Sequence, residues 1–447
     1  MKKDITIIGA GLVGSLLSIY LSKHGYKVKL FERRGDMRKE KMNAGRSINL
    51  ALSDRGIKAL EEVGIMDEIR KICIPMHGRF LHHADGNTGF QPYGKQGQFI
   101  NSVSRGELNK KLMDFAEHHG AEIHFNHNGE SINWETNTIT FEIPGSSLTT
   151  HYSSLIFGSD GAYSVARLQY QLQHDRFQYS QYYIDFGYKE LGIPPDKDGK
   201  FKMEKNALHI WPRGNYMLIA LPNIDGSFTC TLFFPFEGEP SFDSLATKEK
   251  VKTFFEKTFT DALRLMPTLE EDFFTNPTSS LVTVKCYPWI REDKFALIGD
   301  AAHAIVPFFG QGMNCGFEDC SVLNSLIDKY GDNWTTILSE YQELRKPDAD
   351  AIAELALNNF IEMRDRVADP KFILQKKIEA KLHERYPDKW VPAYSQVTVS
   401  PHIRYSEALC RGQKQEAIMK EIMESDNIHE QWNDDKLHQK IIQLINE

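Results

Sequence analysis

The chain has 447 residues, of which 41% are hydrophobic and 26% are charged, so its composition is that of an ordinary globular protein. Its net charge is -8, and a mildly acidic chain lacks the basic surface that nucleic-acid binding requires. The six cysteines form no CxxC pairs and no clusters with histidine, which argues against a metal site or a disulfide framework and fits a reducing, cytoplasmic environment.

The N-terminal segment reads as a strand and not as a signal peptide. Its short apolar run breaks at Gly9 and has no small-residue cleavage site. No other stretch approaches the roughly 18 apolar residues needed to cross a bilayer. We therefore expect a soluble protein without a transmembrane anchor. The oligomeric state is left open, with a homodimer as one option.

The first predicted elements form a strand–helix–strand unit. Ile5–Ile8 is expected to be a buried strand, Gly11–Lys23 a helix and Lys27–Phe31 a second strand. The turn between the first two elements has the sequence GAGLVG at residues 9–14, which fits GxGxxG. Its glycines allow a tight turn and let a pyrophosphate approach the N-terminus of the helix.

An acidic residue follows at the expected distance. Glu32 stands at the end of the second strand, where its carboxylate could accept hydrogen bonds from ribose hydroxyls. The sequence therefore predicts a dinucleotide site, but this motif alone does not distinguish FAD from NAD(P).

In each of two later segments, a predicted apolar strand is followed by an aspartate next to a glycine. The first is IFGSDGAYSVAR at residues 156–167, and the second is ALIGDAAH at 296–303, which continues to GQGMN at 310–314. A helix starting at GQGMN would direct its N-terminal dipole at whatever lies above it, and this would stabilise a nearby anion by about 0.3–1 kcal/mol. His303 is expected to orient the backbone and not to act as a catalytic base.

The middle and the end of the chain have different patterns. Apolar and polar residues alternate in 216–221 and 228–234, which predicts half-buried antiparallel strands joined by a turn. Helices dominate after Gly310. Asp369-Pro370 has the pattern of a helix N-cap followed by proline, and the tail at 432–445 is expected to pack against the body of the protein.

The three glycine- and aspartate-containing segments, in this order over roughly the first 350 residues, resemble those of the single-component flavoprotein aromatic hydroxylases, which have the para-hydroxybenzoate hydroxylase fold. The resemblance implies an α/β protein with a Rossmann-like FAD-binding domain, a second and mainly antiparallel β-sheet domain for the substrate, and a C-terminal helical region. We expect the FAD-binding domain to comprise residues 1–75, 97–178 and 280–350. The substrate domain would comprise 76–96 and 179–279, and the helical region 351–447.

The resemblance also implies a tightly bound, non-covalent FAD. In this family the aspartate matching Asp300 contacts the ribityl chain, and the segment of Asp160 contributes to FAD and pyridine-nucleotide interactions. Arg105 matches an arginine that contacts the cofactor. The residues expected to bind the cofactor are Gly9, Gly11, Val13, Gly14, Glu32, Arg33, Ala51, Arg105, Asp160, Asp300, Gly312, Met313 and Asn314.

Other stretches are similar to the kynurenine 3-monooxygenases within this family, and the similarity extends to about Arg404. They are RSINLALS at 46–53, IPM at 74–76, PYG at 92–94, LHIWPR at 208–213, AIVPFFGQGMN at 304–314 and NFIEMR at 359–364. The resemblance implies that the amino-acid end of the substrate is held by Arg79, Tyr93, Asn359 and Tyr394. A guanidinium suits a carboxylate because it offers two parallel donors. The candidates for contact with the aromatic end are Ile219, Phe233 and Phe309.

The implied reaction is hydroxylation of L-kynurenine to 3-hydroxy-L-kynurenine by dioxygen through a flavin 4a-hydroperoxide, a step of tryptophan catabolism and NAD biosynthesis. NADPH would be a transient cosubstrate, since the chain has no second GxGxxG. No general base is predicted, because the ring amino group of kynurenine already activates the neighbouring carbon.

Two alternatives remain at this point. One is a hydroxylase of another aromatic acid, whose carboxylate Arg79 and Tyr93 would also bind. The other is a non-catalytic flavin-binding interaction protein, which the GD and GQGMN segments argue against.

Overall fold

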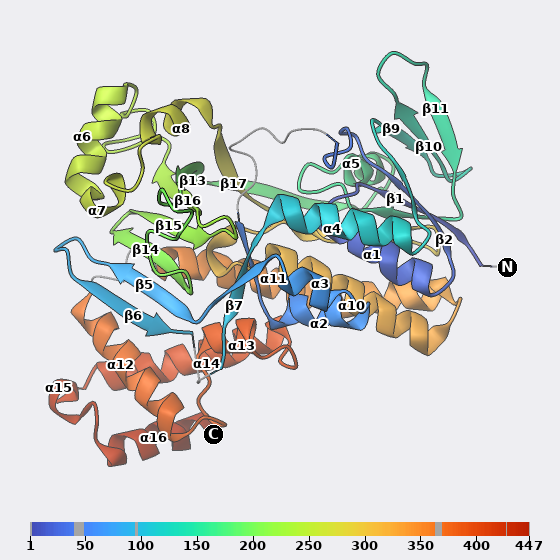
Figure 1. Ribbon diagram of the computed structural model, residues 1–447. Helices are drawn as coiled ribbons and strands as arrows, with labels where there is room; N and C mark the ends of the chain where they lie inside the picture. The colour runs from blue at the N-terminus through green and yellow to red at the C-terminus, as the bar shows by residue number, and fades with distance from the viewer. Residues whose placement is uncertain (1, 40–48, 94–96, 363–368, 426, 447) are drawn as a thin grey trace.

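The computed structural model describes residues 2–39, 49–93, 97–362, 369–425 and 427–446. Two large sheets lie side by side, and helices from the last quarter of the chain lie below strands β5 and β6 in Figure 1. The predicted combination of an α/β unit, a mainly antiparallel second sheet and a helical C-terminal region is confirmed.

The six-stranded sheet has the order β18-β19-β12-β1-β2-β8 and is parallel except for the β18–β19 pair. Four of the five residues of β1 are buried, as expected for a parallel strand covered on both faces. Its strands are β1 (Asp4–Ile8), β2 (Lys27–Phe31), β8 (Glu122–His124), β12 (Leu155–Gly158), β18 (Ile290–Arg291) and β19 (Phe295–Leu297).

The seven-stranded sheet has the order β17-β13-β16-β15-β14-β5-β6 and is antiparallel except for the β14–β5 pair. The predicted hairpin is confirmed as β15–β16, whose turn is closed by a hydrogen bond from Asn223 N to Ser227 O at 2.8 Å. Its strands are β5 (Gly78–His82), β6 (Thr88–Pro92), β13 (Gln178–Ile193), β14 (Ala207–Arg213), β15 (Tyr216–Pro222), β16 (Phe228–Pro235) and β17 (Thr278–Tyr287).

Two smaller sheets complete the strands. One has the order β3-β7-β4 and the other the order β11-β10-β9. Their bounds are β3 (Asn49–Leu52), β4 (Cys73–Met76), β7 (Ile100–Ser104), β9 (Asn128–Asn133), β10 (Thr138–Glu142) and β11 (Thr149–Tyr152).

The helices fall into three groups. Those around the six-stranded sheet are α1 (Leu12–Lys23), α2 (Asp54–Glu62), α3 (Met66–Arg70), α4 (Arg105–His118), α5 (Val165–Leu172), α9 (Asp300–His303), the 3-10 helix η1 (Pro307–Phe309), α10 (Gly312–Tyr330) and α11 (Trp334–Ile361). Those beside the seven-stranded sheet are α6 (Lys248–Thr258), α7 (Thr260–Leu263) and α8 (Leu269–Thr275). The C-terminal helices are α12 (Pro370–Arg385), α13 (Ala393–Thr398), α14 (Tyr405–Met423), α15 (Ile428–Gln431) and α16 (Asp435–Asn446).

The C-terminal helices have a hydrophobic cluster of their own. Asp369 caps α12 and Pro370 is its first residue, as predicted. Ile441 and Ile442 of α16 are buried against residues of α12 and α14, so the prediction that the tail packs against the protein is confirmed. None of the helices in the described ranges is long and apolar enough to cross a membrane.

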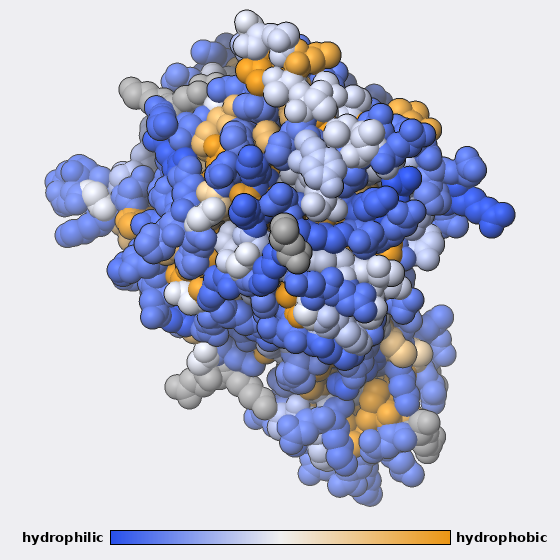
Figure 2. Space-filling model, turned by 90° about the vertical axis from the view of Figure 1, so that its right-hand side faces the viewer, coloured by the Kyte–Doolittle hydropathy of each residue, from blue (hydrophilic) through white to orange (hydrophobic). Residues whose placement is uncertain are grey.

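Figure 2 shows the face that lies at the right in Figure 1. Hydrophilic residues cover most of this face, and hydrophobic residues form small separate groups, one of them on the lower part that holds the C-terminal helices. The large apolar clusters are therefore inside, between the sheets and their helices.

Arg55 joins the N-terminal half of the chain to the C-terminal helices. Its side chain comes from α2 and is fully buried. The guanidinium donates to the carbonyl oxygens of Val397, Gln396 and Ile403 and pairs with Glu318 of α10 at 2.5 Å. It also lies 4.0 Å from the ring centre of Tyr405. One charged group thus satisfies the polar backbone at the turn between α13 and α14.

We predict that Arg55→Met lowers the free energy of unfolding by about 3–5 kcal/mol, because it leaves buried carbonyls without a donor. Arg70→Met is the control. Arg70 is 53% exposed and pairs with Glu61 and Asp67, and exposed pairs contribute about 1 kcal/mol or less. Urea unfolding of the two variants is the measurement, and equal losses would contradict the role given to Arg55.

Candidate active site

The three predicted cofactor segments meet at one edge of the six-stranded sheet. Strand β1 pairs in parallel with β12, and β12 pairs in parallel with β19, with Ile8 opposite Gly158 and Gly158 opposite Leu297. The loops that follow the three strands therefore lie side by side. In open α/β sheets, ligands bind at this carboxyl edge.

The glycine-rich loop is closely packed on one side and open on the other. A side chain on Gly14 would bring its Cβ to 2.1 Å from the carbonyl oxygen of Gly9, and one on Gly9 would lie 2.6 Å from that of Ser159. A Cβ on Gly11, by contrast, would meet no atom within 4 Å. Helix α1 begins beside it without a side-chain cap and without an acidic residue in its first turn. Its N-terminal N–H groups therefore face a space that suits an anion.

Glu32 lies at the predicted place, but its carboxylate also has partners within the protein. It is buried and accepts hydrogen bonds from Ala10 N at 3.1 Å and from Arg34 Nε at 2.8 Å. The sequence reading missed Asn109 of α4, whose amide donates to Ala10 O at 3.3 Å. Glu32 and Asn109 thus fix the peptide groups on either side of Ala10.

The carboxylate of Asp160 forms its hydrogen bonds within its own segment. Its two carboxylate oxygens accept from Ser164 Oγ at 2.5 Å and from the N–H groups of Val165 and Ala166, so it caps the start of α5. Arg167, which was not predicted, is buried and donates to Ala301 O at 2.8 Å. Arg167 therefore joins the Asp160 segment to the Asp300 segment, and its place at the end of the IFGSDGAYSVAR stretch was the available signal.

Asp300 is the first residue of the single-turn helix α9, and its side chain is exposed. The turn before it needs Gly299, which has φ of 62° and would carry a Cβ only 3.0 Å from Val13. The glycine-rich segment and the Asp300 segment are thus in contact.

The predicted helix start at GQGMN is confirmed as the N-terminus of α10. Asn314 holds this start in place, because its amide donates to Ala51 O at 2.8 Å and to Gly310 O at 2.9 Å, and its oxygen accepts from Ser53 N at 3.0 Å. Gly312 and Met313 are partly buried in the first turn of α10.

The two predicted arginines are less enclosed. Arg33 and Arg105 are both exposed, and Arg105 is the first residue of α4, directly after β7. Strand β7 pairs with β3, which carries Ala51. Arg105 therefore lies near the strand of Ala51, whereas Arg33 makes no hydrogen bond or ion pair among the residues that the structure describes.

Arg79 lies between two tyrosines that are distant in sequence. Its guanidinium is 4.4 Å from the ring centre of Tyr394 and 5.6 Å from that of Tyr93. The two tyrosine rings are stacked at 5.6 Å. Arg79 belongs to β5, Tyr93 directly follows β6 and Tyr394 belongs to α13, so the structure brings together three of the four side chains predicted for the amino-acid end.

Phe309 connects this cluster to the loop that precedes α10. Its ring stacks on Tyr394 at 5.5 Å. Asn359 of α11 contacts the same segment, because its amide donates to Phe308 O at 2.8 Å. Ile219 packs against the clusters that contain Tyr93 and Phe309, and Phe233 lies 5.2 Å from Phe308. The seven predicted substrate residues are therefore contiguous.

A separate groove of about 450 Å³ lies between β13, β17, α11 and α14. It contains none of the residues predicted to bind cofactor or substrate. The residues predicted to bind the substrate lie instead in the aromatic region around Phe309 and Tyr394.

The sequence was compared with known proteins. A family model described as "FAD binding domain" matches residues 2–356. A kynurenine 3-monooxygenase of Flavobacterium johnsoniae is 52% identical over 442 residues, covering 99% of this chain and 98% of the relative. One from Sus scrofa is 45% identical over 421 residues, covering 94% and 88%. The chain belongs to the kynurenine 3-monooxygenase family.

Solved structures support the same fold. The tetrameric form of 2-methyl-3-hydroxypyridine-5-carboxylic acid oxygenase is similar with a TM-score of 0.63 and 20% identity, covering 83% of this chain and 94% of that one. Tetracycline destructase Tet(55) has a TM-score of 0.62 and 17% identity, covering 87% and 98%. With the family model and the relatives, the chain is an FAD-dependent monooxygenase. The open space at Gly11 and the uncapped N-terminus of α1 fit such a cofactor.

We predict that Gly11→Ala weakens FAD binding by about tenfold or more while the apoprotein stays folded, because the new methyl group meets only the space of the ligand. Gly14→Ala should lower both FAD affinity and melting temperature, since its Cβ meets Gly9 O. Gly412→Ala is the control, because its Cβ would lie 3.6 Å from its nearest neighbour, Ala393. FAD titration of the apoproteins and their melting curves are the measurements. Normal FAD affinity in Gly11→Ala would contradict this placement of the cofactor.

Proposed function

We propose that the protein hydroxylates L-kynurenine to 3-hydroxy-L-kynurenine, with NADPH as transient cosubstrate and dioxygen as oxidant. The single observation that carries this proposal is the cluster of Arg79, Tyr93 and Tyr394 beside the loop that leads to α10. The names of the relatives agree with it. The product serves tryptophan catabolism and NAD biosynthesis.

Tyr93 gives the strongest support for an anionic group in this cluster. The residue is buried, and its hydroxyl lies near Arg79 and Tyr394 but makes no well-formed hydrogen bond with the residues that the structure describes. Burial also raises the pKa of Tyr93 well above its ordinary value, so the hydroxyl keeps its proton and can donate. A buried donor without a partner costs roughly 1–3 kcal/mol, and a substrate carboxylate would relieve that cost.

The charges around Arg79 suit an amino acid. Burial alone would lower the pKa of Arg79, but Tyr394, Tyr93 and the charge of Glu362 raise it above its ordinary value. Arg79 therefore stays cationic for the substrate carboxylate, while Glu362 contributes a negative charge in the same region. A zwitterionic substrate needs both signs of charge.

The ring of the substrate would extend from Arg79 toward the start of α10. Phe309, Phe233 and Ile219 offer apolar contacts along that direction. Asn359, whose amide donates to Phe308 O, would lie beside these residues and contact the amino-acid end of the substrate. Such a site holds the ring in one orientation and excludes water, which are the main tasks of the protein in this reaction.

We propose a cofactor site built from the loops at the sheet edge. The pyrophosphate would lie at Gly9, Gly11 and Gly14, with the ribityl chain at Asp300 and the flavin at 312–314. Glu32, Val13, Ala51, Asp160, Arg105 and Arg33 would complete the site. When bound, FAD would accept hydride and activate dioxygen. The dipole of α10 would stabilise negative charge on the ring.

No side chain is proposed as a general base. His303, the nearest histidine to these loops in sequence, is buried and bonded to Asp319 at 2.6 Å, so it is directed away from the substrate cluster. Kynurenine needs no such base, because its ring nitrogen donates electron density to the carbon that is hydroxylated.

We also propose a division of the chain by task. Residues 1–75, 97–178 and 280–350 would form the FAD-binding domain, residues 76–96 and 179–279 the substrate β-sheet domain, and residues 351–447 the C-terminal helical region. All six cysteines are free thiols, which supports a cytoplasmic location for the enzyme.

We predict that L-kynurenine greatly accelerates oxidation of NADPH by the purified yellow protein, with 3-hydroxykynurenine as the product. Anthranilate and para-hydroxybenzoate, tested in parallel, separate this function from hydroxylation of another aromatic acid. Chromatography of the product and NADPH absorbance are the measurements. If kynurenine changes neither, the substrate assignment fails while the FAD-dependent class stands.

We predict that Tyr93→Phe raises the KM for kynurenine by about tenfold while the melting temperature stays equal or rises, because the lost hydroxyl is unpaired in the free protein. Arg79→Ala should weaken kynurenine binding further and leave FAD affinity within about twofold. Kinetics and FAD titration of both variants are the measurements. Equal losses of kynurenine and FAD binding in Arg79→Ala would contradict its assigned role.

A further inference from the structure

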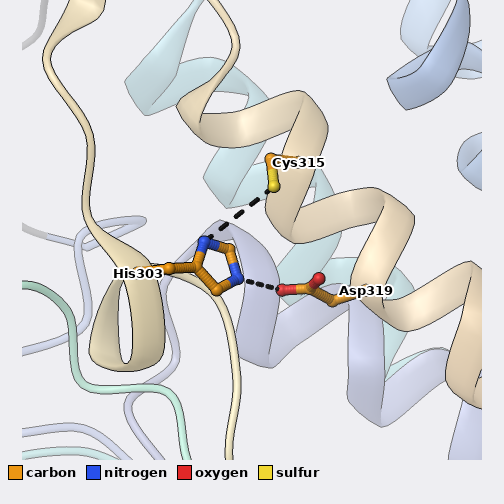
Figure 3. Close-up of side chains that lie close together, drawn as sticks. All are labelled: His303, Cys315 and Asp319. Carbon is orange, nitrogen blue, oxygen red and sulfur yellow. Dashed lines mark hydrogen bonds and ion pairs between the residues drawn. The ribbon is translucent and has the colours of Figure 1, made fainter. Parts of the chain in front are cut away.

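A buried ionic cluster lies directly behind the loop of Asp300. Figure 3 shows His303 of α9 facing Cys315 and Asp319 of α10. His303 Nε2 lies 2.6 Å from Asp319 Oδ2, and His303 Nδ1 lies 3.9 Å from Cys315 Sγ. Arg345 of α11 completes the cluster with a bond from its Nε to Asp319 Oδ1 at 2.7 Å. All four side chains are buried.

The donor atoms of His303, Cys315 and Asp319 lie within 4.8 Å of one another, a spacing that could also hold a metal. Arg345 makes that use unfavourable, because its guanidinium contacts both Asp319 and Cys315 Sγ, the latter at 3.4 Å. A divalent cation there would be repelled by this fixed positive charge. The negative charge of Asp319 is therefore balanced by His303 and Arg345.

Asp319 contacts both ends of the turn that carries Asp300. Its Oδ2 accepts from the backbone N–H of Gly299 at 3.1 Å and from the ring of His303. Gly299 directly precedes α9 and His303 is its last residue, so one carboxylate oxygen fixes the whole turn. Asp300 lies between these two points, with its side chain directed outward to solvent.

The charges that hold this carboxylate are stable. Burial alone would lower the pKa of His303, but Asp319 and Cys315 raise it well above its ordinary value. Burial would likewise raise the pKa of Asp319, but His303 and Arg345 hold it below its ordinary range. The shifts in both pKa values therefore favour an imidazolium that faces a carboxylate.

The same side of α10 also touches the glycine-rich segment. Gly316 lies one turn before Asp319, and a Cβ there would be 2.5 Å from Val13 Cγ2 and 3.5 Å from Gly299 Cα. Cys320 Sγ lies 3.7 Å from Val13 O. A displacement of α10 at Asp319 would therefore move the Asp300 turn relative to α1.

We propose that Asp319, held by His303 and Arg345, is a positioning residue for the bound FAD. It fixes the Gly299–His303 turn so that Asp300 meets the cofactor, and it does so without touching the cofactor itself. The inference rests on the proposed contact of Asp300 with FAD and is independent of the substrate.

Asp319→Asn tests the proposal, with Asp348→Asn as the matched control. Asp348 is also buried and also pairs with Arg345, at 3.3 Å, but its other partners are Arg404 and Ser406 and not α9. Both variants lose one charge from the same arginine. A general loss of stability should therefore affect both, whereas a positioning role is specific to Asp319.

Three properties are measured for each variant: the dissociation constant of FAD, the visible absorption spectrum with the midpoint potential of the bound flavin, and the melting temperature. We expect Asp319→Asn to raise the FAD dissociation constant about tenfold and to shift the spectrum and potential. Asp348→Asn should keep FAD affinity within about twofold and the flavin properties of the unmodified protein, even where its melting temperature falls. Equal FAD affinity and equal flavin properties in the two variants would overturn the proposal.

His303→Gln is the second variant, in case Asp319→Asn does not fold. It leaves Asp319 bonded to Gly299 and Arg345 and removes the imidazole contacts with Asp319 and Cys315 at the end of the turn. A weakened FAD affinity with a shifted flavin spectrum supports the proposal, and FAD binding identical to that of the unmodified protein overturns it. Kynurenine turnover is not needed in either case, so a wrong substrate assignment would not affect the result.

Discussion

Parallel pairing of β1, β12 and β19 is the constraint on which the rest of the structure depends. These strands belong to parts of the chain separated by about 150 and 140 residues, and only their pairing brings the three loops to one edge. Hydrogen bonds from side chains then fix the loops that the strand pairing has brought together. Glu32 and Asn109 hold Ala10, Arg167 reaches Ala301, and Asn314 binds Ala51.

Helix α10 connects these loops to the C-terminal helices. Two adjacent acidic residues near its start have different tasks: Glu318 pairs with Arg55 and Arg345, and Asp319 holds the turn of Asp300. Gln311, just before the helix, accepts from the hydroxyl of Tyr405 at 2.9 Å. The C-terminal helices that supply Tyr394 are thereby fixed relative to the cofactor loops.

The features that local sequence encodes were predicted well. The strands around GAGLVG, the hairpin of β15 and β16 and the start of α10 follow from glycine placement and from apolar periodicity over a few residues. Grouping Arg79 with Tyr394 came only from family resemblance, because nothing local relates residues 315 positions apart. Arg167 and Asn109 were missed since their partners are backbone carbonyls, and only the position of Arg167 at the end of its segment gave a signal. Asp160 was expected at the cofactor, and its role in capping α5 was not predicted, because that role depends on how the loop folds back.

The position of Arg55 has a consequence for how the protein is made. Its carbonyl partner Val397 lies 342 residues later in the chain, so on the ribosome the arginine is synthesised long before anything can pair with it. At roughly 5–20 residues per second, that interval is on the order of 20–70 s. A guanidinium without partners must remain hydrated, so α2 cannot settle into its final contacts until the last quarter of the polypeptide has emerged. The nascent chain therefore exposes the apolar side of α2 for most of its synthesis, a period in which molecular chaperones are the natural protection against aggregation.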